Sequence, residues 1–349
     1  MTHPISKILI RGTNWIGDSV ITFAALREIR RAFRDSHLAL LVKPWVSDLF
    51  TGADFLDEII RYDRRPGPLG FLQFTRFLRT KKFDAAIFLQ NAFEAAALAL
   101  FAGIPIRIGL PTDGRRLLLT HRLDFAYPVS HKHQIYDYLN IAAQVEELLT
   151  GSSRVDFLNP QYQLPVDVET QNRMRDRLRL QGREEGQHLV AINPGATNNP
   201  LKRWYPGRFA ELADRLLKRG NCTIVLVGAA SEEAIADEIL SQMRNHAIKL
   251  TGKTSLAESI AVLSLCDLVI SNDTGPAYIA AALDRPTVTI FGPTNYWSIC
   301  PTSPTSLILI NPVPCAPCRY KKCPYSHECM GGITVDQVYE ATLEQLKIK

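Results

Sequence analysis

The chain has 349 residues, of which 46% are hydrophobic and 21% are charged. This composition is typical of a folded globular protein and excludes intrinsic disorder, and the length favours two domains over a single hydrophobic core. The formal net charge is +5. The excess of Lys and Arg lies in the first half, where it would suit an anionic acceptor or a membrane surface, although solvated helix faces are the commoner explanation.

The sequence predicts neither export nor a membrane span. The N-terminus runs directly into a predicted strand, and the longest apolar run, residues 95–106, is too short to cross a bilayer. We therefore expect a cytoplasmic protein.

Short β-branched runs alternate with amphipathic stretches along the chain, which predicts βαβ units and hence parallel sheets covered by helices. In the first half, the predicted strands cover residues 5–11, 37–43, 58–63, 84–90 and 106–110, and the predicted helices cover 19–33, 69–80, 92–101 and 133–149. In the second half, the predicted strands cover residues 189–193, 223–228, 248–250, 268–271 and 287–291, and the predicted helices cover 206–218, 231–244, 256–265 and 276–283.

The alternation fades between residues 151 and 165, which are rich in Gly, Ser, Asn and Pro. A polar helix is predicted at 168–180 before the alternation starts again. We therefore expect an N-terminal domain at 1–165, a linker and helix at 166–186, and a C-terminal domain at 187–349. Ligands are expected beyond the carboxyl ends of the parallel strands.

The first predicted strand ends in a glycine loop, RGTNWIGD at residues 11–18. The spacing of Gly12 and Gly17 matches a P-loop, but Asp18 stands where the phosphate-binding lysine belongs, so neither the P-loop nor the dinucleotide fingerprint applies. An acid at this strand end is placed to accept a proton from an attacking hydroxyl group. The alternative is an ordinary helix N-cap, a position that Asp favours.

Three segments in the second half suit a diphosphate. NPGA at 193–196 and SNDTGP at 271–276 lie at the ends of predicted strands, and LKRW at 201–204 lies between them in the sequence. The backbone N–H groups of Thr274 and Gly275 would lie at a helix N-terminus, where they can bind an anion. Lys202 offers a mobile positive charge for the same phosphates. The alternatives are a capped turn at 272–275 and a surface lysine beside a stacking Trp204.

In this order and spacing, these segments and the sequence AAALDRPTVTIFGPT at 280–294 resemble the ADP-heptose:lipopolysaccharide heptosyltransferases, glycosyltransferase family 9. Within that family, the second heptosyltransferase is the better match, and the resemblance covers nearly the whole chain. It implies an α/β protein with the GT-B fold, in which two Rossmann-like domains face an interdomain cleft. The N-terminal domain would bind the acceptor, and the C-terminal domain would bind the nucleotide sugar.

The resemblance also implies roles for individual residues. Asp18 falls on the catalytic base of the family, Lys202 on its phosphate-binding lysine and Asp273 on its sugar-contacting acid. Tyr278 takes the place of a histidine that relatives often carry, so any role of that imidazole does not transfer. The other residues of the expected donor site are Thr274 and Gly275, whose amides would bind the diphosphate, Glu232 near the ribose, Thr254 near the adenine, and Asn193 and Gly195 of the NPGA segment.

Four of the seven cysteines lie close together in a Cys-rich segment at 314–330. In the reducing cytoplasm they are expected as thiols or metal ligands rather than as disulfides. A structural zinc or iron–sulfur cluster, a thiol-stabilised loop, a redox cluster and plain unliganded cysteines all remain open, and the segment is expected to lie outside the chemistry. The pattern is C-x₂-C-x₄-C-x₅-C, at Cys315, Cys318, Cys323 and Cys329.

The activity implied by the resemblance is inverting transfer of heptose from ADP-L-glycero-D-manno-heptose to the inner core of lipopolysaccharide, with no cofactor required for catalysis. The implied partners are the ADP-heptose donor and a lipopolysaccharide-core glycolipid at the inner membrane face, where a monomeric protein would bind peripherally. No nucleic-acid partner is expected. The alternatives are a sugar-nucleotide epimerase on a GT-B scaffold and a non-catalytic nucleotide-sugar or metal-binding module.

Overall fold

The computed structural model describes residues 5–125, 133–197, 199–318 and 320–347. The chain forms two compact units, Met1–Tyr162 and Gln163–Lys349. The division lies close to the expected boundary at 165, and residues 166–186, expected as a linker and helix, belong to the second unit.

The first unit is built on a parallel sheet with the strand order β3-β2-β1-β4-β5-β6. This is the Rossmann order, in which the chain starts at the centre of the sheet, winds to one edge and then crosses to the other. The switch point lies between β1 and β4, where the loops diverge and leave room for a ligand. The strands are β1 (Lys7–Arg11), β2 (His37–Val42), β3 (Glu58–Arg61), β4 (Ala85–Phe88), β5 (Ile106–Gly109) and β6 (His121–Arg122).

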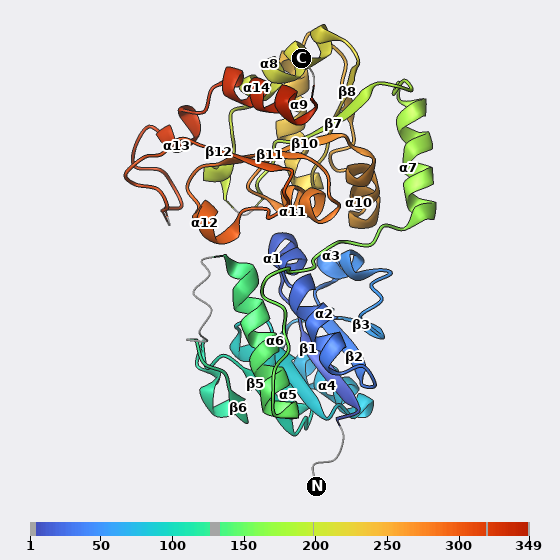
Figure 1. Cartoon of the computed structure of the whole chain (residues 1–349), viewed down its shortest axis with the longest axis vertical. Helices are drawn as coiled ribbons and strands as arrows, with labels where there is room; N and C mark the ends of the chain where they lie inside the picture. The colour runs from blue at the N-terminus through green and yellow to red at the C-terminus, as the bar shows by residue number, and fades with distance from the viewer. Residues whose placement is uncertain (1–4, 126–132, 198, 319, 348–349) are drawn as a thin grey trace. The chain divides into compact units, whose positions relative to one another are not determined.

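Helices cover both faces of this sheet (Figure 1). On one face α2 and α6 lie side by side, and α4 packs against α5. Leu9 of β1 joins Leu78 of α4 and Leu98 of α5 in a buried apolar cluster, and because the central strands are buried on both faces, their sequences are continuously apolar. The helices are α1 (Ile16–Ile21), α2 (Phe23–Ala32), α3 (Pro44–Ser47), η1 (Asp48–Phe50), α4 (Gly67–Lys81), α5 (Phe93–Phe101), η2 (Arg115–Leu118) and α6 (Gln134–Thr150).

The single helix predicted at 19–33 is divided at Thr22, whose hydroxyl donates a 2.7 Å hydrogen bond to the Ser19 carbonyl. Such a local side-chain bond competes with the helical backbone ladder. The first helix also begins earlier than predicted, at Ile16, with Trp15 as its N-cap. Asp18 therefore lies inside the first turn of α1, and the N-cap interpretation of this residue is wrong.

The second unit repeats the Rossmann order, as β12-β11-β10-β7-β8-β9, with its switch point between β7 and β10. Both units are thus parallel α/β sandwiches, which confirms the predicted fold class. The strands are β7 (His188–Asn193), β8 (Cys222–Leu226), β9 (Ile248–Lys249), β10 (Leu268–Asn272), β11 (Thr287–Phe291) and β12 (Ser306–Ile310).

Helices α7 and α14 complete the layers of the second unit. Helix α7 packs on α10, and Gln171 donates a 2.7 Å hydrogen bond to the Ser264 hydroxyl. Trp204 is 1% exposed, and its indole N–H donates to the Ile333 carbonyl at 2.9 Å just before α14, which anchors the LKRW segment. The helices are α7 (Val168–Leu180), η3 (Pro200–Lys202), α8 (Pro206–Arg219), η4 (Ala230–Glu232), α9 (Glu233–Gln242), α10 (Leu256–Leu265), α11 (Gly275–Ala282), α12 (Tyr296–Ile299), α13 (Glu328–Gly331) and α14 (Val335–Gln345).

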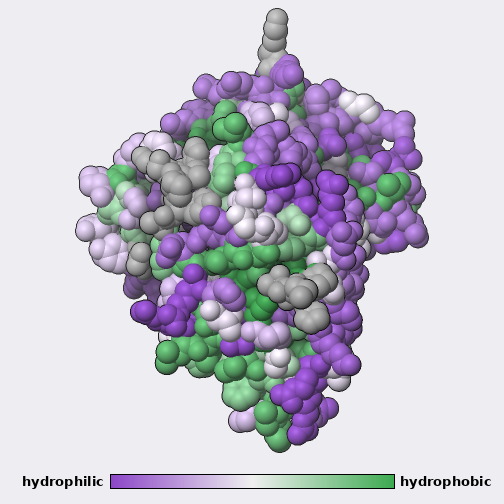
Figure 2. All heavy atoms as spheres, turned by 60° about the horizontal axis from the view of Figure 1, so that its bottom comes forward, coloured by the Kyte–Doolittle hydropathy of each residue, from purple (hydrophilic) through white to green (hydrophobic). Residues whose placement is uncertain are grey.

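Within the described part of the chain, no helix combines the length and apolar character needed to cross a membrane. Figure 2 shows hydrophilic side chains over much of the face it presents, with apolar side chains exposed in groups between them.

Candidate functional site

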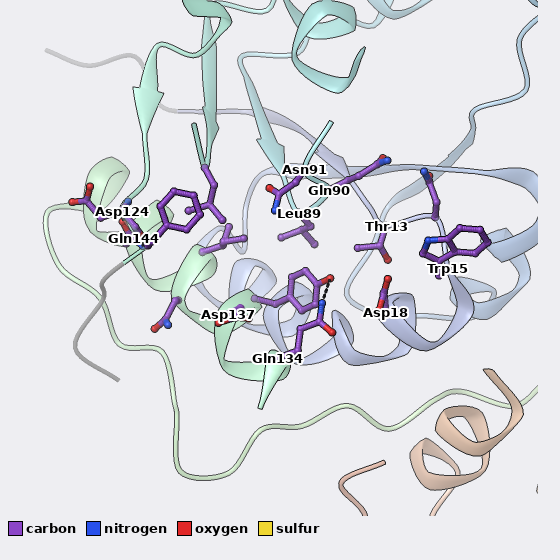
Figure 3. Close-up of a pocket in the computed structure, with 16 residues that line it drawn as sticks. Thr13, Trp15, Asp18, Leu89, Gln90, Asn91, Asp124, Gln134, Asp137 and Gln144 are labelled. Carbon is purple, nitrogen blue, oxygen red and sulfur yellow. Dashed lines mark hydrogen bonds between the residues drawn. The ribbon is translucent and has the colours of Figure 1, made fainter. Parts of the chain in front are cut away.

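The first unit contains a pocket of about 410 Å³ at the carboxyl edge of its sheet, beside the switch point between β1 and β4 (Figure 3). The loop after β1, the segment after β4 and one face of α6 form its walls. The α6 side chains that line it recur every three or four residues and so share one face of that helix. The polar lining residues are Thr13, Asn14, Asp18, Gln90, Asn91, Asp124, Gln134, Asp137, Asn140 and Gln144.

Asp18 lines this pocket from the first turn of α1 and lies beside Thr13 in Figure 3. The next residue, Ser19, is fully buried, and its hydroxyl lies 2.9 Å from that of Thr13, which fixes the glycine loop against the helix. Burial, and then the nearby Asp18 carboxylate, raise the pKa of the Tyr138 hydroxyl on α6. The Asp18 charge is therefore held close to the α6 wall of the pocket.

A fully buried arginine, Arg115, holds the segment that follows β4. Its guanidinium donates to the Leu110 carbonyl at 2.8 Å, to Asn91 Oδ1 at 2.7 Å and to the Gln90 carbonyl. Burial lowers the pKa of Arg115 to about 10, so the group remains charged at neutral pH. Its donors are engaged by the chain itself, and Arg115 therefore shapes the pocket without lining it.

Two acceptor atoms of the pocket residues are buried without a hydrogen-bond donor among the described groups. They are Gln90 Oε1 and Asn140 Oδ1. A buried acceptor without a donor is unfavourable until a ligand or water supplies one. None of the described residues that line the pocket is a Lys, Arg or His. The pocket is therefore suited to an uncharged, hydroxyl-rich group.

In the second unit, the predicted donor-site residues Lys202 and Asp273 form an ion pair. Lys202 Nζ lies 2.7 Å from Asp273 Oδ2, and the Asp273 side chain is only 2% exposed. The Tyr278 hydroxyl donates to Asp273 Oδ1 at 2.9 Å, and the Thr294 hydroxyl donates to Oδ2 at 2.7 Å. The carboxylate that ends β10 is thus held by three donors from three different segments.

The switch point of the second sheet is closed by side-chain hydrogen bonds. Asn193, the last residue of β7, donates to the Ser271 hydroxyl at 3.1 Å and to the Thr274 hydroxyl at 2.7 Å. Thr274 is the N-cap of α11, and Gly275 is its first residue. The backbone N–H groups of both residues lie at the start of the helix, where the helix offers them no acceptor. Their binding of an anion stays a prediction.

Gly195 and Glu232 are in direct contact. A Cβ atom at Gly195 would lie 2.0 Å from the Glu232 carboxyl carbon, so any larger residue would have to displace this side chain. The Glu232 carboxylate accepts hydrogen bonds from the Thr197 hydroxyl and the Ala229 backbone N–H, both at 3.0 Å, and the residue is 6% exposed. Its orientation is therefore fixed at the carboxyl edge of the sheet.

Thr254 lies on the segment between β9 and α10, and its hydroxyl is 2.8 Å from that of Ser259. Within the described residues, no hydrogen bond joins Thr254 to the other predicted donor-site residues. Its expected contact with a nucleotide base depends on its place at the carboxyl edge of the sheet.

The four clustered cysteines are free thiols that line one small cavity of about 20 Å³. Arg319, within the same segment, lies outside the described residues. Across the described residues, no group of three or more His, Cys, Asp or Glu side chains could hold a metal ion. The suggested structural metal is therefore unsupported. Two contacts join the segment to the donor-site loops: His327 Nε2 lies 2.7 Å from the Leu201 carbonyl, and the Cys318 N–H donates to the Pro293 carbonyl at 2.8 Å.

Several polar residues at these sites were not among the predicted ones. In the second unit, Thr294 and Tyr278 hold Asp273. Thr294 follows a predicted strand, in the sequence FGPT. The expectation that ligands bind beyond the carboxyl ends of parallel strands would therefore have identified it. In the first unit, Gln90 and Asn91 follow β4 in the same way. The α6 residues that line the pocket are recognisable only as a polar stripe on a helix face that is otherwise buried.

Comparison with known proteins identifies similar chains. The profile of glycosyltransferase family 9 (heptosyltransferase) matches residues 71–328. The chain is 28% identical to lipooligosaccharide heptosyltransferase 2 of Haemophilus ducreyi over 87% of this chain and 88% of that protein. It is also 28% identical to lipopolysaccharide heptosyltransferase 2 of Escherichia coli over 83% of each chain. The solved structure of the E. coli ADP-heptose heptosyltransferase II superposes with a TM-score of 0.82 over 98% of both chains, at 24% identity, and supports the GT-B fold.

Proposed function

Because the chain belongs to glycosyltransferase family 9, the heptosyltransferases, we propose that it transfers heptose from ADP-heptose to the inner core of lipopolysaccharide. The names of the similar proteins support this substrate pair, and neither an epimerase nor a non-catalytic module is supported by them. The observation that carries the proposal is the position of Asp18, an acid that lines a pocket for a hydroxyl-rich group at the switch point of the first sheet.

In the proposed reaction, the Asp18 carboxylate accepts the proton of an acceptor hydroxyl group. The acceptor oxygen forms a bond to the anomeric carbon of heptose as the bond from that carbon to the diphosphate breaks. ADP leaves with its electron pair, and the configuration at the anomeric carbon is inverted. The reaction as written needs no cofactor, because a carboxylate takes the proton and a lysine stabilises the leaving diphosphate.

The donor would be held at the carboxyl edge of the second sheet. Lys202 and the N–H groups of Thr274 and Gly275 supply positive charge and hydrogen-bond donors for the diphosphate, whose charge increases as it leaves. Asp273 would contact the sugar hydroxyls, and the fixed Glu232 carboxylate would accept hydrogen bonds from the ribose. Both acids are already oriented by donors of the chain, so little ordering remains when the nucleotide sugar binds.

The acceptor glycolipid lies in a membrane, and α4 offers a surface for peripheral binding. Helix α4 contains no acidic residue. Leu69, Leu72 and Phe77 on this helix are 76%, 44% and 42% exposed, and Arg76 is exposed between them. Apolar side chains flanked by arginine are typical of surfaces that rest on anionic membranes. We propose that this surface brings the first unit to its acceptor at the inner membrane.

The decisive experiment is Asp18→Asn. The amide is nearly isosteric but cannot accept the proton, so turnover with a lipopolysaccharide-core acceptor should fall by about 10²–10⁴-fold. Because Asp18 lies in a first helical turn, loss of its charge should cost at most about 1 kcal/mol of stability. Glu169→Gln, in the first turn of α7, is the matched control and should retain turnover. Wild-type turnover in Asp18→Asn would exclude Asp18 as the base.

A further inference from the structure

An exposed aromatic stack lies just beyond the end of β11 in the second unit. The rings of Tyr296 and Trp297, both in α12, are stacked with their centroids 4.3 Å apart and an interplanar angle of 29°. The turn is fixed by a 2.9 Å hydrogen bond from the Asn295 side-chain amide to the Ser298 hydroxyl. Trp297 is nevertheless 63% exposed, although tryptophan is highly buried on average. One face of its ring is thus covered by Tyr296, and much of the rest is open.

Both ends of α12 lie beside Asp273, the acid that contacts the donor sugar in the proposed reaction. Before the helix, the Thr294 hydroxyl donates to Asp273 Oδ2 at 2.7 Å. After the helix, burial and then the Asp273 charge raise the pKa of the Cys300 thiol, although a backbone hydrogen bond partly offsets them. The Cα atoms of Tyr296 and Trp297 lie within about 11 Å of that of Thr294, because they are two and three residues away. The stack is therefore within reach of a sugar held by Asp273.

The strand order places the stack on the sugar side of the proposed donor site. Across the second sheet, β11, β10, β7, β8 and β9 are neighbours in that order. The expected adenine residue Thr254 follows β9, the expected ribose residue Glu232 follows β8, and the diphosphate amides lie at the switch point between β7 and β10. A nucleotide sugar laid along this edge therefore ends with its sugar at Asp273, after β10. The next strand, β11, is about 4.8 Å further on, a separation that one sugar ring can bridge.

The chemistry of a sugar matches both parts of this arrangement. Hydroxyl groups at the rim of the ring suit hydrogen bonds to a carboxylate, and the C–H groups on its faces suit contact with an aromatic ring. Asp273, which is 2% exposed and already oriented, supplies the carboxylate, and Trp297 supplies the ring. Adenine is a poorer occupant of the stack, because its expected contacts lie at the opposite end of the site, at β9.

We propose that Trp297, supported by Tyr296, stacks on the sugar ring of the ADP-linked donor and favours sugars that present a C–H face towards β11. The inference rests on the proposed function and deepens it, because it adds a contact to the sugar that is transferred. No residue of the predicted donor site lies in α12. Trp297 is a binding residue in this scheme and takes no part in proton transfer, which belongs to Asp18.

Calorimetric titration of the full chain with ADP and with ADP-heptose isolates the contribution of the sugar. The ratio of the two dissociation constants measures how much the sugar adds to the affinity of the nucleotide. Trp297→Ala should reduce this ratio by about 3–10-fold, the range for one aromatic contact, and leave the ADP dissociation constant unchanged. Trp297→Phe should retain most of the ratio. Tyr325→Ala, which removes a 61% exposed ring from the Cys-rich segment, is the matched control and should change neither constant.

A measurement on the wild-type chain does not depend on the folding of a variant. In the ¹⁵N-labelled protein, the indole resonance of Trp297, assigned with Trp297→Phe, should shift saturably with ADP-heptose and much less with ADP. Equal shifts with the two ligands would overturn the proposal, because the ring would then report on the nucleotide alone. An unchanged ratio of dissociation constants in Trp297→Ala would overturn it as well.

The outcome for the stack is separable from the outcome for the proposed function. A wild-type chain that transfers no heptose to a lipopolysaccharide-core acceptor, while its affinity for the sugar still depends on Trp297, would refute the proposed function and leave the aromatic contact standing. A wild-type chain that transfers heptose, with a sugar affinity that is the same in Trp297→Ala, would leave the proposed function standing and refute the aromatic contact.

Discussion

The variant Lys202→Met tests whether the charge of Lys202 in the proposed donor site stabilises the fold, binds the diphosphate, or does both. The change removes the ammonium that lies 2.7 Å from the buried Asp273 carboxylate and keeps a side chain of similar length. Loss of one partner from a fully buried ion pair costs about 3–5 kcal/mol. Here the Lys202 side chain is 23% exposed, and the hydroxyls of Tyr278 and Thr294 still donate to the carboxylate. We therefore expect the free energy of unfolding to fall by about 1–3 kcal/mol.

The same substitution should weaken ADP binding by about 10–100-fold, because the diphosphate loses a charge-assisted contact. The double variant Lys202→Met/Asp273→Asn distinguishes the two effects. An asparagine needs no cation, so the double variant should regain most of the stability that Lys202→Met loses. It should not regain ADP affinity, since the ammonium is still absent.

Urea unfolding and calorimetric titration with ADP measure the two quantities on the same variants. Lys218→Met, exposed in the last turn of α8, is the matched control and should change neither. An unchanged ADP dissociation constant in Lys202→Met would remove this lysine from the donor site. Full recovery of ADP affinity in the double variant would show that Lys202 only neutralises Asp273, which contradicts direct contact with the diphosphate.

Two further predictions concern stability. Burial raises the pKa of Glu146, but hydrogen bonds, led by the one from Arg31, outweigh burial and hold the pKa below its ordinary value of 4.5. The stabilisation by this contact between α2 and α6 is therefore present above about pH 4.5 and is lost as the pH falls through the lowered pKa. The urea midpoint should therefore fall more steeply below pH 4.5 in the wild type than in Glu146→Gln, and parallel curves would contradict this reasoning. Gly195→Ala should cost about 1–3 kcal/mol because the new methyl group meets the Glu232 carboxylate. Gly207→Ala, whose methyl group meets only the mobile end of Gln242, is the control, and equal melting temperatures of the two variants would refute the steric argument.

Sequence reasoning reached the fold because its central strands are buried on both faces. The runs ILIR at the end of β1 and LVISN in β10 are apolar up to Arg11 and Ser271, respectively. This change from apolar to polar residues marks the carboxyl edge of each sheet. Strand β6 has two residues and thus leaves no periodic signal, so it was not predicted. The start of α1 was missed because Gly17, a poor helix former, lies within its first turn.

Contacts between segments that are distant in sequence were beyond prediction. The Lys202–Asp273 pair joins residues that a motif can name, but its geometry depends on Trp204, which is buried under α14 and fixes the preceding turn. The cations around the Tyr62 ring come from the ends of β1, β2 and β3, and only the first of these strand ends belongs to a motif. Such groupings follow from strand order, because neighbours in a Rossmann sheet come from separate βαβ units.

Tyr278 illustrates how the structure changes the interpretation of a single substitution. The family resemblance predicts a histidine at this position, whose imidazole could exchange a proton near neutral pH. In this chain the tyrosine hydroxyl donates 2.9 Å to Asp273, together with Lys202 and Thr294. The tyrosine hydroxyl thus serves as one of the donors that hold this carboxylate. The role that this position retains is therefore to orient the Asp273 carboxylate, and proton transfer in the proposed reaction is left to Asp18.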